Sequence, residues 1–170
     1  QSSELLMAAF PFYKQLDAKD CGPACLRMIA KYYGKSYNLQ TLREKSYITR
    51  EGVSLLGISD GAEAIGFRTM GVSMNFDQLL KDAPLPLIAH WKQNHFIIVY
   101  KITRKTIYVA DPAYGLVKYN KNEFKKGWFS GKVDGEDKGL ALLLEPKPEF
   151  YAEEGEEVKK SSFRFLLRYL

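Results

Sequence analysis

In the first third of the chain, apolar residues recur every three or four positions, which is the spacing of one face of a helix. One such stripe follows Pro23 and consists of Cys25, Met28, Ile29 and Tyr32. Because Pro is tolerated in a first helical turn and Gly commonly ends a helix, a helix is predicted from Pro23 to just before Gly34. Two shorter helices are predicted over residues 39–45 and 54–65, the second ending before Gly66. The residues of the latter that should face inward are Leu55, Leu56, Ile58, Ala62 and Ile65.

After Gly66 the pattern changes to short apolar runs that have the length of β-strands. These runs are RTMGVSM (68–74), PLIAHW (86–91), HFIIVYKI (95–102), TIYVADPA (106–113), GLVKYN (115–120) and LALLLEP (140–146). One helical turn, FDQLLKDA (76–83), interrupts them. Helices followed by a series of strands are typical of α+β proteins. We therefore predict an α+β fold in which an N-terminal helical part packs on an antiparallel β-sheet.

The two ends of the chain differ in composition from its middle. Residues 1–10 are predicted to be an N-terminal extension, in which Met7 is a candidate natural start, and residues 11–150 a single folded domain. Residues 151–170 are predicted to be a linker and a helix start, because a charged stretch, YAEEGEEVKK, leads into the apolar pattern SSFRFLLRYL. We expect that helix to continue in a further domain.

Charge and composition exclude several classes of protein. The net charge of +5 comes from 25 basic and 20 acidic residues spread along the chain, without the basic stripes and interleaved aromatics of a nucleic-acid-binding surface. The longest apolar runs, FIIVY and LALLL, are far shorter than the about 20 residues that span a membrane. Two cysteines are too few for a disulfide framework, which favours a reducing compartment or a thiol with a chemical role. We expect a cytosolic domain that does not bind nucleic acid.

Cys21 lies directly before Gly22 and Pro23, where the first helix should begin. The unpaired N–H groups at a helix N-terminus favour negative charge and therefore a thiolate. Gly22, which has no Cβ, would let a substrate approach the backbone closely. The alternative is that Cys21 is a small buried apolar residue. Cys25, one turn further on the inward stripe, is predicted to be a core residue.

A cysteine nucleophile needs a base, and the chain has only two histidines, His90 and His95. His95 opens the most apolar strand. A tight hairpin after this strand would pair residues whose numbers sum to about 206 or 207, which places Asp111 beside His95. There the carboxylate could orient the imidazole, as in a catalytic triad, although a lone histidine on a strand is more often structural. Zinc binding by the cysteines and histidines is not expected, because their spacing differs from that of known zinc sites.

Gln15, six residues before Cys21, offers a side-chain amide that could stabilise an oxyanion together with the Cys21 backbone N–H. Taken alone, Gln15 could equally be a surface amide. Asp17 and Asp20 are each able to cap the helix. An Asp20 carboxylate facing the thiol would oppose its ionisation, so neither aspartate is assigned a catalytic role.

Three stretches of the sequence resemble the papain-like cysteine peptidases: QLDAKDCGPACLRMIAKYYG (15–34), HFIIVY (95–100) and ADPAYG (110–115). More narrowly, they resemble the C39 peptidases, the N-terminal domains of bacterial ABC transporters that export bacteriocins and related peptides. The resemblance covers about residues 11–146. It implies a papain-like fold with Cys21 as the nucleophile and His95 as the base. It also implies that Asp111 orients the histidine and that Gln15 is the oxyanion donor.

The resemblance further implies a substrate and a setting. The substrate would be a precursor peptide, bacteriocin or signal, that is cut after a Gly-Gly pair ending its leader. The peptidase domain would need no cofactor, and ATP would serve only the ATPase domain that follows a transmembrane domain in such transporters. It would lie on the cytoplasmic side of the bacterial inner membrane. Two alternatives are a related docking module that has lost the nucleophile and a free-standing papain-like amidase or transglutaminase; the presence of Cys21 argues against the first.

Overall fold

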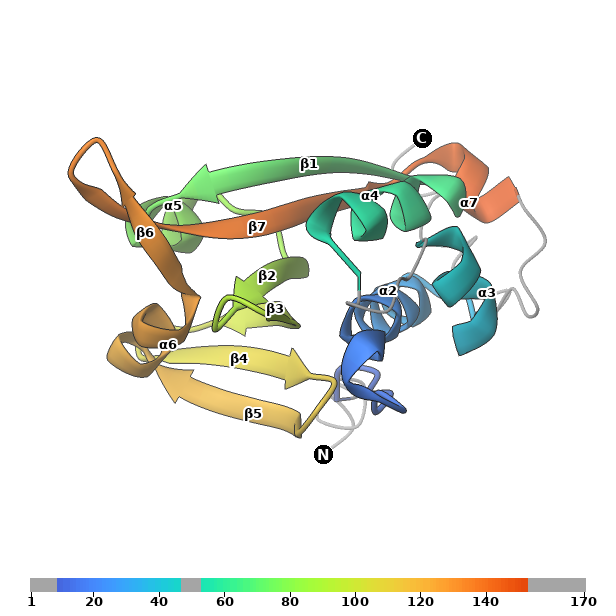
Figure 1. Cartoon of the computed structure of the whole chain (residues 1–170), viewed down its shortest axis with the longest axis horizontal. Helices are drawn as coiled ribbons and strands as arrows, with labels where there is room; N and C mark the ends of the chain where they lie inside the picture. Colours follow the sequence, from blue (N-terminus) through green and yellow to red (C-terminus); the bar gives the residue numbers. More distant parts are fainter. Residues whose placement is uncertain (1–8, 47–52, 153–170) are drawn as a thin grey trace, which may run out of the picture.

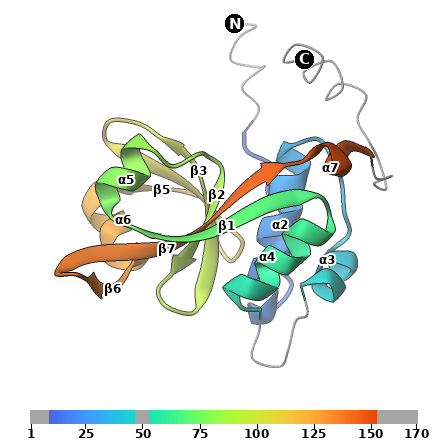
Figure 2. The ribbon, with the colours of Figure 1, turned by 90° about the horizontal axis from the view of Figure 1, so that it is seen from above.

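Helices and strands occupy largely separate halves of the molecule (Figures 1 and 2). The computed structural model describes residues 9–46 and 53–152. The helical half contains η1 (Ala18–Asp20), α2 (Cys21–Tyr32), α3 (Leu39–Lys45), α4 (Leu55–Ala64) and α7 (Pro148–Ala152). The other half contains β1 (Phe67–Met74), α5 (Phe76–Lys81), β2 (Leu87–Trp91), β3 (His95–Ile102), β4 (Thr106–Asp111), β5 (Gly115–Asn120), α6 (Lys121–Trp128), β6 (Phe129–Val133) and β7 (Glu136–Pro146).

Helix α2 begins at Cys21 rather than at Pro23, because the 3-10 turn η1 runs directly into it. The helix ends as predicted before Gly34, whose φ of +100° is a left-handed conformation that favours glycine. Cys25 and the following apolar residues of the stripe are buried, except that Tyr32 is half exposed. The helix therefore presents one apolar face to the sheet, with its N-terminus at the edge of the contact.

Side-chain caps set the starts of the next two helices. The Asn38 side chain accepts a hydrogen bond from the Thr41 N–H (2.8 Å) at α3, and Ser54 caps α4 in the same way. Both helices agree with the predicted ranges to within one residue at each end. The inward orientation predicted for Leu56 is wrong, since this side chain is 71% exposed. Ile58 and Ala62 define the buried stripe, and Leu56 lies about 200° around the helix from Ile58.

The strands form one antiparallel sheet in the order β1-β7-β2-β3-β4-β5, with β6 pairing to the outer part of β7. This confirms the predicted α+β class and the antiparallel sheet. The sequence patterns did not predict α6 and β6, which occupy residues 121–133. A signal for α6 is present, because Asn120 and Glu123 form a capping box with reciprocal hydrogen bonds of 2.9 and 3.1 Å.

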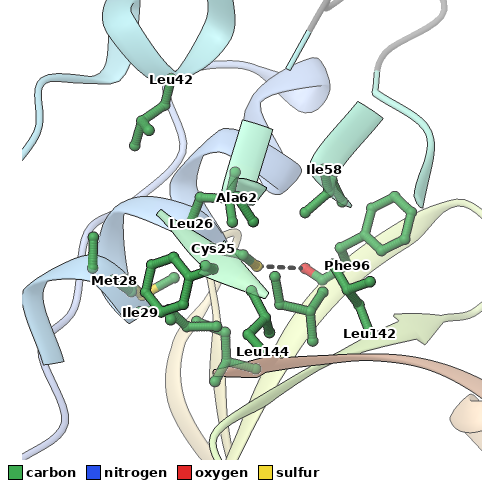
Figure 3. Close-up of a cluster of buried hydrophobic side chains, with 14 of the residues drawn as sticks. Cys25, Leu26, Met28, Ile29, Leu42, Ile58, Ala62, Phe96, Leu142 and Leu144 are labelled. Atoms are coloured by element: carbon green, nitrogen blue, oxygen red, sulfur yellow. Dashed lines mark hydrogen bonds between the residues drawn. The ribbon is translucent and has the colours of Figure 1, made fainter. Parts of the chain in front are cut away.

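The central strands are buried on both faces, which explains why their apolar residues are continuous rather than alternating. Side chains at even positions pack against the helices and include Ile88, Phe96, Ile98 and Ala110. Figure 3 shows part of this first core, where α2, α4 and the sheet meet. Side chains at odd positions form a second core with α5 and α6 and include Leu87, Ala89, Ile97, Val99 and Val109.

The packed domain extends slightly beyond the predicted start at residue 11. Phe10 is buried and stacks on Tyr100, with ring centroids 4.7 Å apart. At the other end, Phe150 is fully buried. The rest of the predicted extension and most of the predicted linker and terminal helix lie outside the described residues. Within the described ranges, no helix is long and apolar enough to cross a membrane.

Replacing Cys25 by Ala should lower the free energy of unfolding by about 1–2 kcal/mol, as expected for a small truncation in a packed core. The Cys25 side chain is fully buried, and its thiol donates a hydrogen bond to the Phe96 carbonyl over 3.5 Å (Figure 3). The substitution removes both the volume and the donor. Urea denaturation of the two proteins measures the difference, and equal midpoints with equal slopes would contradict the packing role.

Candidate active site

Cys21 is the first residue of α2, and its side chain is almost entirely covered, with 4% of the residue exposed. The prediction that Gly22 leaves space for a substrate is wrong. A Cβ at Gly22 would lie 2.9 Å from Cγ1 of Ile58 and closer still to Val53. Gly22 therefore allows α2 to pack against α4 and the segment before it, and this packing fixes the start of α2 and the position of Cys21.

His95 and Asp111 meet as predicted. Nε2 of His95 lies 2.7 Å from Oδ1 of Asp111, which is 1% exposed. The same carboxylate oxygen accepts a hydrogen bond from the Ala113 N–H (2.9 Å), so the turn after β4 holds the carboxylate in place. Because Nε2 faces Asp111, Nδ1 is the ring nitrogen left to face the Cys21 thiol, whose interaction with the ring contributes to the raised pKa of His95. The imidazole thus bridges the thiol and the carboxylate.

The hairpin register differs from the prediction although the contact is right. Ile98 pairs with Ala110 and Ile102 with Ile107, so the paired numbers sum to 208 and 209 instead of 206 or 207. The turn lies one residue later than predicted, and the ladder shifts by one between Val99 and Lys101. With a sum of 208, residues 95 and 111 are diagonal neighbours on one face of the sheet, and a diagonal pair is still within reach of long side chains.

The environment of His95 favours its protonated form. Burial lowers the pKa of His95, but the hydrogen bonds to Asp111 and Cys21 and their negative charges outweigh burial and raise the pKa from 6.5 to about 9. Burial, followed by the charges of Cys21 and Asp111, raises the pKa of Cys25, which keeps this second thiol neutral. At neutral pH the arrangement therefore offers an imidazolium next to the Cys21 thiol and an unreactive thiol one turn away.

Gln15 lies in the loop before η1, and its backbone N–H donates a hydrogen bond to the Pro112 carbonyl (2.8 Å). This bond attaches the loop to the turn that carries Asp111. Gln15 lines a pocket of about 290 Å³ together with His95 and Asp111. Its Oε1 is buried and has no hydrogen-bond partner among the described residues. The Gln15 side chain therefore lines the same pocket as the imidazole of His95.

The other residues around this pocket were not singled out from the sequence. They are Ala18, Trp91, Lys92, Asn94, Ala113, Tyr114 and Tyr119. They come from the η1 turn, the end of β2, the β2–β3 turn, the β4–β5 turn and β5. No short motif joins these segments; the hairpin pairings and the hydrogen bond from the Gln15 N–H to the Pro112 carbonyl bring them together. Tyr114 is 84% exposed, so it projects into solvent at the rim of the pocket.

His90 does not contact the group formed by Cys21, His95 and Asp111. It pairs with Phe96 in the β2–β3 ladder, and its ring lies 5.2 Å from the Phe96 ring. Because successive side chains of a strand point to opposite faces, His90 lies on the other face of the sheet from His95. In the part of the chain that the structure describes, no group of three or more His, Cys, Asp or Glu side chains could hold a metal ion.

Asp17 and Asp20 both act at the start of the helical region. Asp17 caps η1, accepting a hydrogen bond from the Lys19 N–H (2.7 Å). The Asp20 side chain makes no cap hydrogen bond to α2 and instead pairs with Arg43. The carboxylate next to Cys21 is therefore directed toward α3. Arg43 was not identified from the sequence, since nothing in its neighbourhood marks it.

The chain matches the pattern of the peptidase C39 family over residues 9–133. Among curated proteins, it is 38% identical over 141 residues to the lactococcin-G-processing and transport ATP-binding protein LagD of Lactococcus lactis subsp. lactis. That alignment covers 80% of this chain but 19% of the relative. The chain thus spans about a fifth of the length of this relative.

Two solved structures are similar to the fold. One is a double glycine motif protease from an AMS/PCAT transporter, in complex with the leader peptide; its TM-score is 0.74 at 31% identity, covering 82% of this chain and 94% of the other. The second is the peptidase domain of Streptococcus ComA, with a TM-score of 0.70 at 29% identity, covering 82% and 100%. The α+β fold is therefore the papain-like fold of C39 peptidase domains. By its sequence and its fold, the chain belongs to the peptidase C39 family.

Proposed function

We propose that the chain is a cysteine endopeptidase domain that removes the leader from precursor peptides by cutting after a Gly-Gly pair. The observation that carries this proposal is the bridging position of His95, with Cys21 on one side and Asp111 at 2.7 Å on the other. A docking module would not need this arrangement. The family and the relatives named above support the substrate class, since one neighbour is a double glycine motif protease bound to a leader peptide.

The proposed reaction is acyl transfer through a thioester. The Cys21 thiolate attacks the carbonyl carbon of the second glycine, and the resulting oxyanion accepts hydrogen bonds from the Cys21 backbone N–H and the Gln15 amide. As the C–N bond breaks, His95 gives its proton to the leaving amine. His95 then takes a proton from water, which hydrolyses the thioester and releases the leader. Asp111 holds the imidazole in the orientation that both proton transfers need.

The burial of Cys21 gives a physical reason for glycine at the cut. With 4% of this residue exposed, a peptide reaches the sulfur only by lying very close to the protein surface. A Cβ on either residue before the cut would then displace the carbonyl carbon from the sulfur. The distance and angle between the sulfur and the carbonyl carbon would then be wrong for attack, and even a small misplacement of these two atoms reduces the rate strongly.

We further propose that the domain works at the cytoplasmic side of the bacterial inner membrane, joined to transmembrane and ATPase domains of one transporter. The support is that the relative LagD is named as a processing and transport ATP-binding protein and that this chain matches 19% of it. ATP would bind only to the ATPase domain. No cofactor takes part in the peptidase chemistry as proposed, since thiolate, imidazole and amide supply every step.

A kinetic series on one leader peptide tests the proposed specificity. Replacing either glycine before the cut by Ala should lower kcat/KM by more than about 200-fold, which is the upper range for one methylene in a roomy pocket. The matched control is Gly→Ala or Ser→Ala at an upstream leader position, which should change kcat/KM by less than about tenfold. Efficient cleavage of peptides with Ala at both positions would identify a general cysteine peptidase instead.

A further inference from the structure

A fully buried carboxylate lies directly before the proposed nucleophile. Asp20 is 0% exposed and occupies the N-cap position of α2, yet its side chain makes no cap hydrogen bond to that helix. Burying a carboxylate is costly unless it is paired and hydrogen-bonded. A negative charge next to Cys21 would also oppose the formation of a thiolate. The sequence therefore places a costly group where it should interfere with the chemistry.

Arg43, in the last turn of α3, binds this carboxylate with two of its nitrogens. Its Nε donates to Oδ1 of Asp20 over 2.7 Å, and its Nη2 donates to Oδ2. Oδ2 also accepts a hydrogen bond from the Asp17 N–H at 3.2 Å. Such two-point binding of a carboxylate is specific to the planar guanidinium, and it fixes both position and charge. The carboxylate is held toward α3.

Among the described residues, three other titratable groups belong to the surroundings of Cys21. His95 on β3 interacts with Cys21, Asp111 on β4 bonds to His95, and Cys25 lies on α2 itself. Of these, His95 carries a positive charge at neutral pH because its pKa is raised to about 9, and burial keeps Cys25 neutral. Asp20 is thus the one carboxylate adjoining Cys21 in the sequence, and among the described residues the cation paired with it is Arg43.

We propose that Arg43 is a positioning residue of the peptidase, which holds the Asp20 carboxylate away from Cys21 and neutralises its charge so that the thiol ionises beside His95. This inference rests on the proposed role of Cys21 as the nucleophile. The same pair links the start of α2 to α3, so it also fixes where Cys21 lies. A purely structural link would not depend on the charge of Asp20, and this difference makes the role testable.

The test is the pH profile of Cys21 alkylation by iodoacetamide in the whole domain, followed by mass spectrometry of the Cys21 peptide. Arg43→Gln should move the midpoint of the profile upward by about one pH unit and slow alkylation at pH 7 about tenfold, because Asp20 is then unpaired. The double variant Arg43→Gln/Asp20→Asn should have its midpoint back at the wild-type value. Lys45→Gln removes a positive charge from the same turn of α3 and should leave the midpoint unchanged.

Asp20→Asn alone leaves the Arg43 cation without its partner, so its midpoint should lie at or below that of the wild type. Should Arg43→Gln fail to fold, as judged by circular dichroism, this variant carries the test. A midpoint above the wild type in Asp20→Asn, no shift in Arg43→Gln, or no rescue in the double variant would each overturn the role of Arg43. A wild-type Cys21 that is alkylated only above about pH 8, as an ordinary thiol is, would instead contradict the proposed function.

Discussion

Cys21→Ala is expected to abolish leader cleavage, with a loss of about 10⁴-fold or more in kcat, while the domain stays folded. Removing the nucleophile from a set of groups that act together removes nearly all of the chemistry, because His95 and Asp111 have no other atom to activate. The substitution removes one sulfur atom from a nearly covered position, so the fold should tolerate it. The measurement is single-turnover cleavage of a labelled leader peptide, with circular dichroism as the check on folding.

Cys25→Ala is the matched control, because it removes the same atom one turn further along α2. This variant should cleave the leader within about twofold of the wild type, although it is less stable. Iodoacetamide should label Cys21 and leave Cys25 unmodified, since Cys25 is fully buried and its raised pKa keeps it neutral. Retained activity in Cys21→Ala, or faster labelling of Cys25, would show that the two thiols had been assigned in reverse.

The fold class followed from the sequence because two periods, helical before Gly66 and extended after it, are strong signals in consecutive parts of the chain. The reading was weakest where tertiary contacts decide. Leu56 is apolar but lies off the stripe set by Ile58 and Ala62, and only packing shows which side faces the core. A capping signal at Asn120 precedes residues 121–133, but the many charged residues there leave α6 without a clear apolar stripe in the sequence.

The candidate active site could be assembled from the sequence as far as local rules extend. A helix start placed Cys21, and a hairpin brought Asp111 to His95, even though the register was one or two residues off. The diagonal contact tolerated that error, because an even sum of paired numbers keeps both side chains on one face. Arg43 could not be found in this way. Its partner Asp20 is distant in sequence, and the pair depends on how α3 packs beside α2.

The second large effect concerns His95. His95→Ala should slow the alkylation of Cys21, because the thiolate loses its imidazolium partner. It should also abolish cleavage, because the leaving amine then has no proton donor. His90→Ala is the matched control and should do neither, since His90 lies on the other face of the sheet. Cleavage assays and alkylation rates at neutral pH compare the two variants. Loss of activity in His90→Ala with activity retained in His95→Ala would exchange the roles of the histidines.

Asp111→Asn should keep the fold but reduce turnover by about 10⁴-fold, the loss seen when a triad loses the carboxylate that orients its histidine. The pH profile separates this role from a structural one. The raised pKa of about 9 means that His95 keeps its proton well above neutral pH and loses it as the pH rises through about 9, so wild-type kcat/KM should fall there. Without the Asp111 charge, this decline should move to lower pH, toward the ordinary histidine value of 6.5.

The free energy of unfolding should also decrease as His95 loses its proton. A folded-state pKa above the unfolded value of 6.5 contributes stability that is fully present below about 6.5 and is lost as the pH rises through about 9. Wild-type midpoints of urea denaturation should therefore decline across this window, and the decline should be smaller in Asp111→Asn. A wild-type enzyme whose kcat/KM falls near pH 6.5, or an Asp111→Asn variant with the wild-type profile and full turnover, would show that another group orients His95 and retains its proton.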